Sequence, residues 1–152
     1  MNKLGWLGAA LSVLLMSGGA MAQSCPSGTT RVTSGTPADG GTSGGNFAGF
    51  ITNARVCASR GTDRWQEWHQ SGGPLFDWKL GPGHAMDPRK QVGTWTSSNG
   101  ANATVTHTYG SNSYVWAICR TNAAAPFDYT MVSPTGGTVT GVRILVGDGA
   151  CP

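Results

Sequence analysis

The segment Gly93–Arg120, GTWTSSNGANATVTHTYGSNSYVWAICR, alternates runs of β-branched and aromatic residues with clusters of turn-forming residues. Ser98-Asn99-Gly100 and Gly110-Ser111-Asn112 separate these runs. Asn-Gly favours tight hairpin turns, because both residues tolerate positive φ. Alternation of apolar and polar side chains is typical of a strand with one face buried. The segment therefore predicts antiparallel strands joined by hairpins.

The same rhythm extends over the rest of the chain, where strand-like runs recur at intervals of about a dozen residues. Clusters of Gly, Asn, Ser or Pro close each run. No stretch after residue 23 keeps an apolar period of 3.6 for three turns, so we expect no helix longer than a single turn. We expect eight strands: Phe50–Ala58, Arg64–Gln70, Pro74–Leu80, Gln91–Ser97, Ala103–Tyr109, Tyr114–Thr121, Phe127–Val132 and Val139–Val146.

Strands with short connections pair mostly with their sequence neighbours, so the expected strands predict an all-β, antiparallel up-and-down meander. Closing the meander into a barrel removes exposed edges and leaves an interior wide enough for side chains or one small ligand. A β-sandwich is the alternative architecture. The period of two predicts these core residues: Phe76, Trp78 and Leu80; Tyr114, Trp116 and Ile118; Val142, Ile144 and Val146; and Val92 or Trp95.

Residues 1–22 have the pattern of a secretory signal peptide. Lys3 precedes the apolar stretch Leu4–Met16, and Ala20-Met21-Ala22 fits the small-x-small cleavage rule, with the cut after Ala22. The stretch is shorter than the roughly 20 residues of a membrane span, so we expect no transmembrane anchor. The mature chain is then periplasmic or secreted, in a bacterial host.

The mature chain divides into a Gly/Ser/Thr-rich segment, 23–49, and a single β domain, 50–152. Ser34–Asn46 holds too few apolar residues to offset the entropy lost on ordering, which predicts a mobile loop. Charged residues are 11% of the chain and the formal net charge is +3, without a basic run. This charge pattern argues against a nucleic-acid partner.

The chain has four cysteines, Cys25, Cys57, Cys119 and Cys151, and no CxxC pair. An even number of cysteines in an exported chain favours disulfides over a metal site. In the expected meander, Cys119 and Cys151 lie at one end of the barrel and Cys57 at the other. We therefore predict the pairs Cys25–Cys57 and Cys119–Cys151.

Gly93-Thr94-Trp95 resembles the Gly-x-Trp motif of lipocalins and other calycins, although three expected strands precede it here and none do in lipocalins. The stretch Asn53-Ala54-Arg55-Val56-Cys57, which leads into the meander, is similar to one in small lipocalin-like exported proteins of bacteria. The resemblance implies a barrel with an apolar ligand in its mouth. It assigns no individual ligand-binding residue.

Trp65, Glu67 and His69 project to one face of their expected strand, and Asp77 lies on the next strand. A carboxylate beside an imidazole can perform acid–base chemistry, but a solvated strand face has the same pattern. One of Trp65 and Trp68 must face outward, where it could form an aromatic platform. The connection Gly81–Arg89, which carries His84, is either a structural turn or a lid over the barrel mouth.

Neither a catalytic motif nor a metal-binding spacing is present, and the three histidines are scattered, so we expect no metal and no cofactor. The leading hypothesis is a non-catalytic exported domain that binds a small apolar or aromatic molecule, or a glycan, at the barrel mouth. Its predicted ligand-binding residues are Trp65, Glu67, Trp68, His69, Asp77 and His84. The alternatives are a protein-interaction or inhibitor module of the cell envelope, and a hydrolase that uses Glu67, His69 and Asp77.

Overall fold

The computed structural model describes residues 23–60, 63–78 and 85–152, so the predicted signal peptide and His84 lie outside the described residues. No helix in these ranges is long and apolar enough to cross a membrane. The elements in chain order are β1 (Thr30–Arg31), the 3-10 turn η1 (Pro37–Asp39), α1 (Phe47–Ile51), β2 (Ala54–Arg60), β3 (Asp63–His69), β4 (Pro74–Asp77), β5 (Lys90–Ser98), β6 (Thr104–Tyr109), β7 (Asn112–Arg120), β8 (Tyr129–Val132) and β9 (Thr138–Val146).

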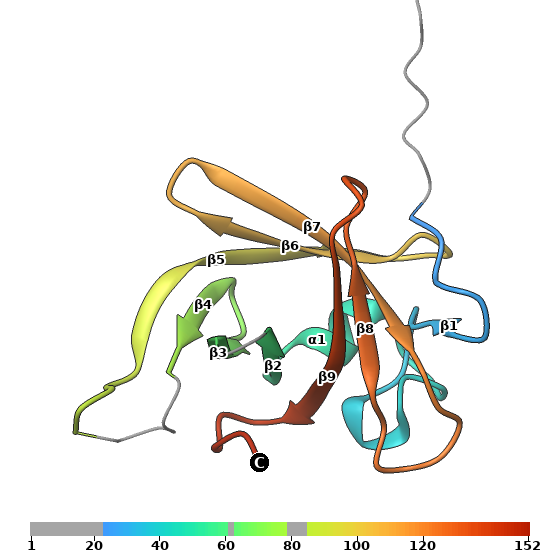
Figure 1. The fold of residues 1–152 in the computed structure, drawn as a ribbon, viewed down its shortest axis with the longest axis horizontal. Helices are drawn as coiled ribbons and strands as arrows, with labels where there is room; N and C mark the ends of the chain where they lie inside the picture. The colour runs from blue at the N-terminus through green and yellow to red at the C-terminus, as the bar shows by residue number, and fades with distance from the viewer. Residues whose placement is uncertain (1–22, 61–62, 79–84) are drawn as a thin grey trace, which may run out of the picture.

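Strands β2 to β9 form a closed antiparallel barrel in which each strand pairs with the next one along the chain (Figure 1). The circle closes between the first and last of these strands, where Val56 of β2 lies opposite Ile144 of β9. β1 lies outside the circle and pairs with β7. The closed meander predicted from the sequence is therefore confirmed.

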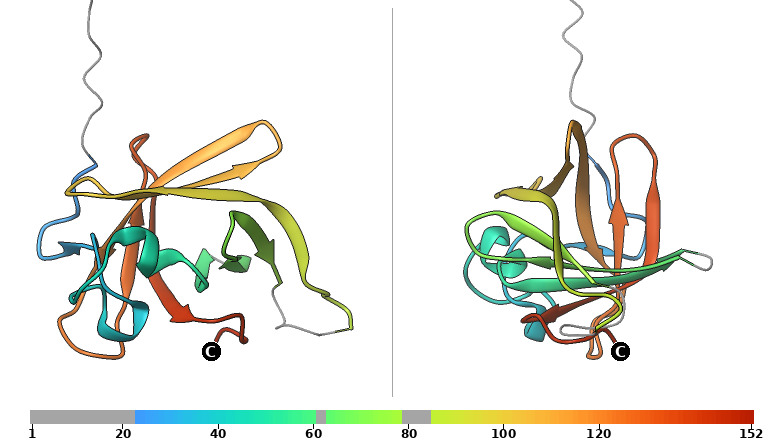
Figure 2. Two further views of the ribbon diagram at one scale, coloured as in Figure 1. Left: turned by 180° about the vertical axis from the view of Figure 1, so that it is seen from behind. Right: turned by 90° about the vertical axis from the view of Figure 1, so that its left-hand side faces the viewer.

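β7 changes neighbours along its length, and this opens the barrel wall. Its first half, up to Trp116, pairs with β6, whereas its second half, Ala117–Arg120, pairs with β8. The β6–β7 and β8–β9 hairpins consequently diverge and project as two separate arms (Figure 2). β1 runs along the other edge of the second half, with Thr30 opposite Arg120.

A short helix stands where the sequence predicted the start of the first strand. The side chain of Asn46 caps α1, and Phe47 and Phe50 on this helix are fully buried in the core. Asn53, at φ 57°, then turns the chain into β2. The strand therefore begins at Ala54 rather than at Phe50, because the capped turn already buries the preceding aromatic residues.

The predicted inward faces of β7 and β9 are confirmed at the centre of the barrel. Ile118, Val142 and Ile144 are buried in one hydrophobic cluster. Tyr114 and Val146, at the ends of the same faces, are 49% and 62% exposed. Alternation thus gave the faces correctly but did not show where each strand leaves the core.

The predicted inward face of β4 is wrong. Leu75 is the fully buried residue that faces the interior, whereas Phe76 lies opposite Trp68 in the register between β3 and β4. Trp78 is fully buried, as predicted, but it packs against Trp68 on the outer side, with ring centroids 6.3 Å apart. Leu75 and Phe76 are both apolar, so their order alone does not reveal the buried face. Leu80 lies outside the described residues.

The segment predicted to be a mobile loop, Ser34–Asn46, folds instead around the carboxylate of Asp39. Asp39 accepts hydrogen bonds from the backbone N–H groups of Thr36, Gly41 and Thr42 and from the hydroxyl of Ser43. These bonds satisfy backbone donors that would otherwise depend on water, and they hold the turn without a large apolar surface.

The disulfides connect Cys25 to Cys119 and Cys57 to Cys151, so the predicted pairing Cys25–Cys57 with Cys119–Cys151 is wrong. Both bridges join residues 94 positions apart. The N-terminal segment reaches Cys119 because β1 pairs with β7 rather than staying beside β2.

The C-terminal tail reaches Cys57 because it turns back after β9 instead of continuing past the end of the barrel. Gly147, at φ 77°, makes this reversal. The buried side chain of Gln66, which lies opposite Cys57 on the outer side of β3, then holds the tail by two hydrogen bonds. Its amide donates to Gly149 O at 2.7 Å and accepts from Cys151 N at 2.6 Å.

Non-reducing peptide mapping should recover Cys25–Cys119 and Cys57–Cys151 peptides. Replacing Cys25 and Cys119 together by Ser should lower the free energy of unfolding by about 2–5 kcal/mol, because the unfolded chain regains the freedom of a long loop. Urea denaturation of the double variant measures this loss. Recovery of a Cys25–Cys57 peptide from the native protein would contradict the pairing.

Candidate functional site

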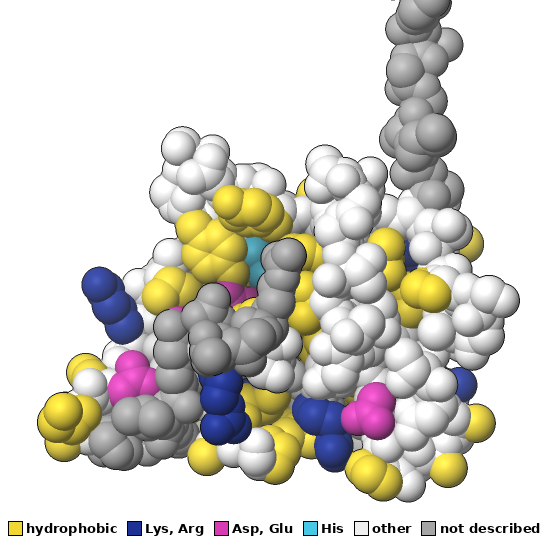
Figure 3. Space-filling view, viewed as in Figure 1, with side chains coloured by type: hydrophobic (Ala, Val, Ile, Leu, Met, Phe, Trp, Pro, Cys, Tyr) yellow, Lys and Arg dark blue, Asp and Glu magenta, His cyan; other side chains and the backbone are white. Residues whose placement is uncertain are grey.

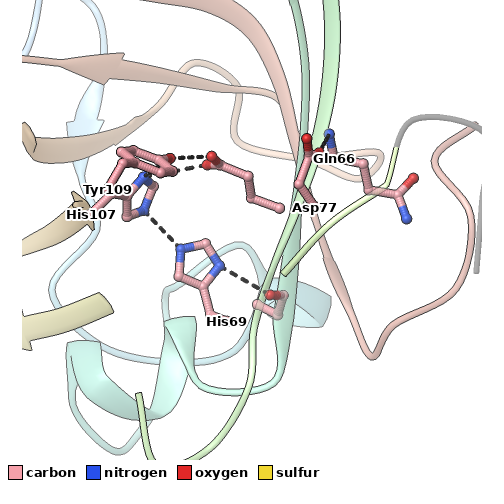
Figure 4. A network of polar contacts seen from close by, with 7 residues as sticks. Gln66, His69, Asp77, His107 and Tyr109 are labelled. Atoms are coloured by element: carbon pink, nitrogen blue, oxygen red, sulfur yellow. Dashed lines mark hydrogen bonds and ion pairs between the residues drawn. The ribbon is translucent and has the colours of Figure 1, made fainter. Parts of the chain in front are cut away.

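A chain of buried polar side chains crosses the barrel interior between β3 and β6 (Figure 4). Glu67 and His69 alternate inward on β3, and His107 and Tyr109 do so on β6. The Tyr109 hydroxyl donates to Glu67 Oε1, and Glu67 Oε2 lies 3.3 Å from His107 Nδ1. His107 Nε2 is 2.9 Å from His69 Nε2, and His69 Nδ1 is 3.2 Å from the carbonyl oxygen of Ala54.

The carbonyl oxygen of Ala54 fixes the direction of the whole chain, because it can only accept a hydrogen bond. His69 Nδ1 must therefore carry a proton, which leaves Nε2 of this neutral ring as an acceptor. His107 Nε2 must then be the donor to His69, and in a neutral ring this leaves His107 Nδ1 as an acceptor. The nearest group that can donate to this nitrogen is the carboxyl of Glu67 in its protonated form, since the Tyr109 hydroxyl lies farther away, at 3.5 Å, and donates to Glu67 Oε1.

Burial favours this same neutral arrangement. It raises the pKa of Glu67 to about 7, an increase to which Asp77 adds and which the hydrogen bond from Tyr109 opposes. It lowers the pKa of His69 to about 4. The pKa of His107 also falls well below its ordinary value, through burial and then the neighbouring His69. We therefore read the Glu67–His107 contact as O–H···N rather than as an ion pair.

A pocket of about 230 Å³ opens next to this chain, between the first half of β7 and the β8–β9 hairpin. It is lined by Trp65, Glu67, Tyr109, Tyr114, Trp116, Met131 and Val139. On the corresponding face, hydrophobic side chains surround a recessed histidine and acidic side chains (Figure 3). The pocket is thus an aromatic cavity with a carboxyl group in its wall.

Trp95 closes the interior behind the polar chain. Its indole N–H donates to Gln70 O at 2.9 Å, and its ring meets His69 edge-on with centroids 5.4 Å apart. Gly93 allows β5 to approach β6 closely, because a Cβ at this position would collide with the carbonyl oxygen of Thr108. Both ends of the Gly-x-Trp pattern therefore have a structural role here.

The predicted site residues separate into three groups. Trp65 and Glu67 line the pocket, and His69 lies behind Glu67, fully enclosed. Asp77 is opposite Glu67 on β4 and accepts a hydrogen bond from the backbone N–H of Gln66 at 3.4 Å. Trp68 lies elsewhere, on the outer side of β3.

Trp68 belongs to an outer cluster with Phe76 and Trp78 that the guanidinium of Arg89 covers. The Arg89 carbon Cζ lies 5.1 Å from the centroids of Trp68 and Phe76 and 5.9 Å from that of Trp78. Arg89 also pairs with Asp148 at 3.0 Å. Trp68 therefore packs against a cation from the chain itself, away from the pocket that Trp65 and Glu67 line.

Sequence reasoning did not identify Tyr109, and it assigned Tyr114 and Trp116 to the core and His107 to no site. The signal was present, because His107 and Tyr109 have the same i, i+2 spacing as Glu67 and His69. What the sequence lacks is any indication that β3 and β6, which are not neighbours in the sheet, meet across the interior.

No group of three or more His, Cys, Asp or Glu residues that could hold a metal ion occurs among the described residues. No family model, curated protein or solved structure matches the chain. The resemblance to lipocalins stays a prediction.

Glu67→Gln should become more stable relative to the wild type as the pH rises from 4.5 to 7.5. The native state keeps the Glu67 proton up to a pKa of about 7, whereas the unfolded state loses it near the ordinary 4.5, so the wild type loses stability over this interval. A neutral amide can still donate to His107 and accept from Tyr109. The difference should grow by about 3 kcal/mol, measured by urea denaturation at both pH values.

The two histidines change the stability in the opposite direction, because their neutral forms are favoured by folding and stability is lost as the pH falls below 6.5. This effect is common to the wild type and the variant, so it cancels in the difference. A difference that does not change with pH would mean that Glu67 is already ionised in the folded protein at pH 4.5 to 7.5.

Proposed function

We propose that this protein is an exported, non-catalytic barrel that binds a small aromatic molecule in the pocket between β7 and the β8–β9 hairpin. The observation that carries the proposal is the lining of this pocket, which combines four aromatic side chains with one carboxyl group. Binding sites for small molecules are mostly apolar cavities with a few placed polar groups.

The size of the pocket limits the ligand. A cavity of about 150 Å³ in another protein is large enough to hold benzene. About 230 Å³ therefore admits one ring with a short substituent, or two small fused rings. This volume lies below the roughly 300 Å³ at which pockets for drug-sized ligands begin.

The chemistry of the lining favours an aromatic ligand over the other hypotheses. A glycan needs many hydrogen-bond partners, whereas this wall offers mainly rings and aliphatic groups around Glu67 and Tyr109. A hydrolase in which His69 touches the substrate is disfavoured, because that side chain is fully buried behind Glu67. A pocket lined by aromatic and aliphatic side chains also supports a small ligand more than a protein partner.

Export is part of the proposal. The signal-peptide pattern of residues 1–22 and two disulfides that pair all four cysteines both suit an oxidising compartment. We place the protein in the periplasm or outside a bacterial cell.

Isothermal titration calorimetry with indole and 2-phenylethanol tests the pocket. We expect saturable binding with a Kd of about 1 mM or tighter, given the small size of these probes. Tyr114→Ser should weaken binding about 3- to 10-fold, because it removes one stacking ring at a half-exposed position.

Val146→Ala is the matched control, since Val146 is an exposed apolar residue that does not line the pocket. This variant should bind both probes with the affinity of the wild type. Equal loss of affinity in both variants, or no binding of either probe to the wild type, would refute the proposed pocket.

A further inference from the structure

We infer that the pocket selects an aromatic amine in its ammonium form, with the carboxylate of Glu67 as the counter-ion. This inference rests on the proposed function and names the class of ligand. It follows from the charge of the lining, from the rings around the carboxyl group, and from the proton that Glu67 holds.

The lining contains one acidic side chain and no Lys, Arg or His. Glu67 is 8% exposed, which leaves it accessible from the pocket but largely removed from water. An anionic ligand such as a carboxylate would find no cation here, and it would be repelled once Glu67 is ionised. A cationic ligand would find a counter-ion in an environment where charge interactions are weakly screened.

The aromatic side chains suit the same ligand. Trp65, Tyr109, Tyr114 and Trp116 line the pocket around the carboxyl group, and the faces of such rings attract cations. Tyr109 donates to Oε1 and His107 faces Oε2, so both carboxyl oxygens are already positioned. Each oxygen has a second acceptor site, and an ammonium group has three donors to offer.

The titratable groups that face Glu67 determine how binding responds to pH. They are His69 on its own strand, Asp77 on β4, and His107 and Tyr109 on β6, with Tyr114 of β7 farther out. The two histidines are held neutral by burial, so Glu67 is the group that changes charge near neutral pH, where its pKa is about 7.

Ammonium and proton compete for the same carboxyl group. When an ammonium ion binds the protonated form, the O–H bond of Glu67 breaks and one proton leaves to the buffer. His107 can then present a proton on Nδ1 to the carboxylate if both rings change tautomer. His69 Nε2 becomes the donor to His107, and the hydrogen bond to Ala54 O is given up.

Titration calorimetry with 2-phenylethylamine and 2-phenylethanol at pH 5.5 and 8.5 tests the inference on the wild-type protein. An alkylammonium ion stays protonated throughout this range, like Lys, whose ordinary pKa is about 10.4. With Glu67 titrating near 7, the amine should bind about 30-fold more weakly at pH 5.5. The affinity of the alcohol should change by less than about twofold, because it carries no charge.

Proton release gives an independent measurement. At pH 5.5, titrations of the amine in two buffers with different ionisation enthalpies should show close to one proton released per amine bound, and at pH 8.5 close to none. Glu67→Gln, which mimics the protonated carboxyl, should lose the preference for the amine and its pH dependence. Asp128→Asn, which removes a carboxylate that faces Arg143 instead, should keep the wild-type profile.

The outcomes separate the two proposals. If the alcohol binds as well as the amine at pH 8.5, or if the affinity of the amine does not change with pH, the ammonium inference is overturned and the aromatic pocket stands. If neither probe binds, the pocket proposal fails. The wild-type pH profile decides the matter even if Glu67→Gln does not fold.

Discussion

A single backbone carbonyl determines the protonation of the barrel interior. The carbonyl oxygen of Ala54 can only accept a hydrogen bond, and each partner from His69 to His107 is thereby forced into one role. This chain of hydrogen bonds ends at Glu67, whose carboxyl group must be protonated to donate to His107. Because unpaired polar groups are costly in a buried site, the carboxyl group beside the pocket stays protonated up to a pKa of about 7. The electrostatic character of the pocket thus originates on a strand that does not line it.

The second constraint is that the two halves of β7 pair with different strands. A strand that paired fully with both neighbours would seal the wall and leave no opening beside Glu67. Pairing β6 with the first half and β8 with the second exposes Tyr114 and Trp116 to the pocket. The cost is a free edge on the second half, which β1 and the Cys25–Cys119 bridge cover. The division of β7 between two neighbours therefore accounts both for the pocket and for the place where β1 pairs.

Sequence patterns predicted what is local and missed what depends on distant partners. Alternation on β3 correctly placed Trp65 and Glu67 on one face, because a strand imposes that period. It did not show that Tyr109 on β6, three strands away from β3 around the barrel, would donate to Glu67. The predicted disulfide pairing was wrong for a similar reason. The chain reversal at Gly147 and the hydrogen bonds of Gln66 to the tail produce no periodic pattern in the sequence. Composition likewise underestimated the order that one residue, Asp39, imposes on a Gly-rich segment.

The fastening of the C-terminal tail has a mechanical consequence. Cys151 is bonded to Cys57 on β2, Asp148 is held by Arg89, and Gln66 binds the backbone of Gly149 and Cys151, so the tail is anchored outside the strand pairing that closes the barrel. A pulling force applied at Pro152 would load the covalent bridge before it reached the ladder between β2 and β9. The hydrogen bonds between β2 and β9 could then not be broken one after another from the C-terminus, so the closed barrel would resist tension applied at this end.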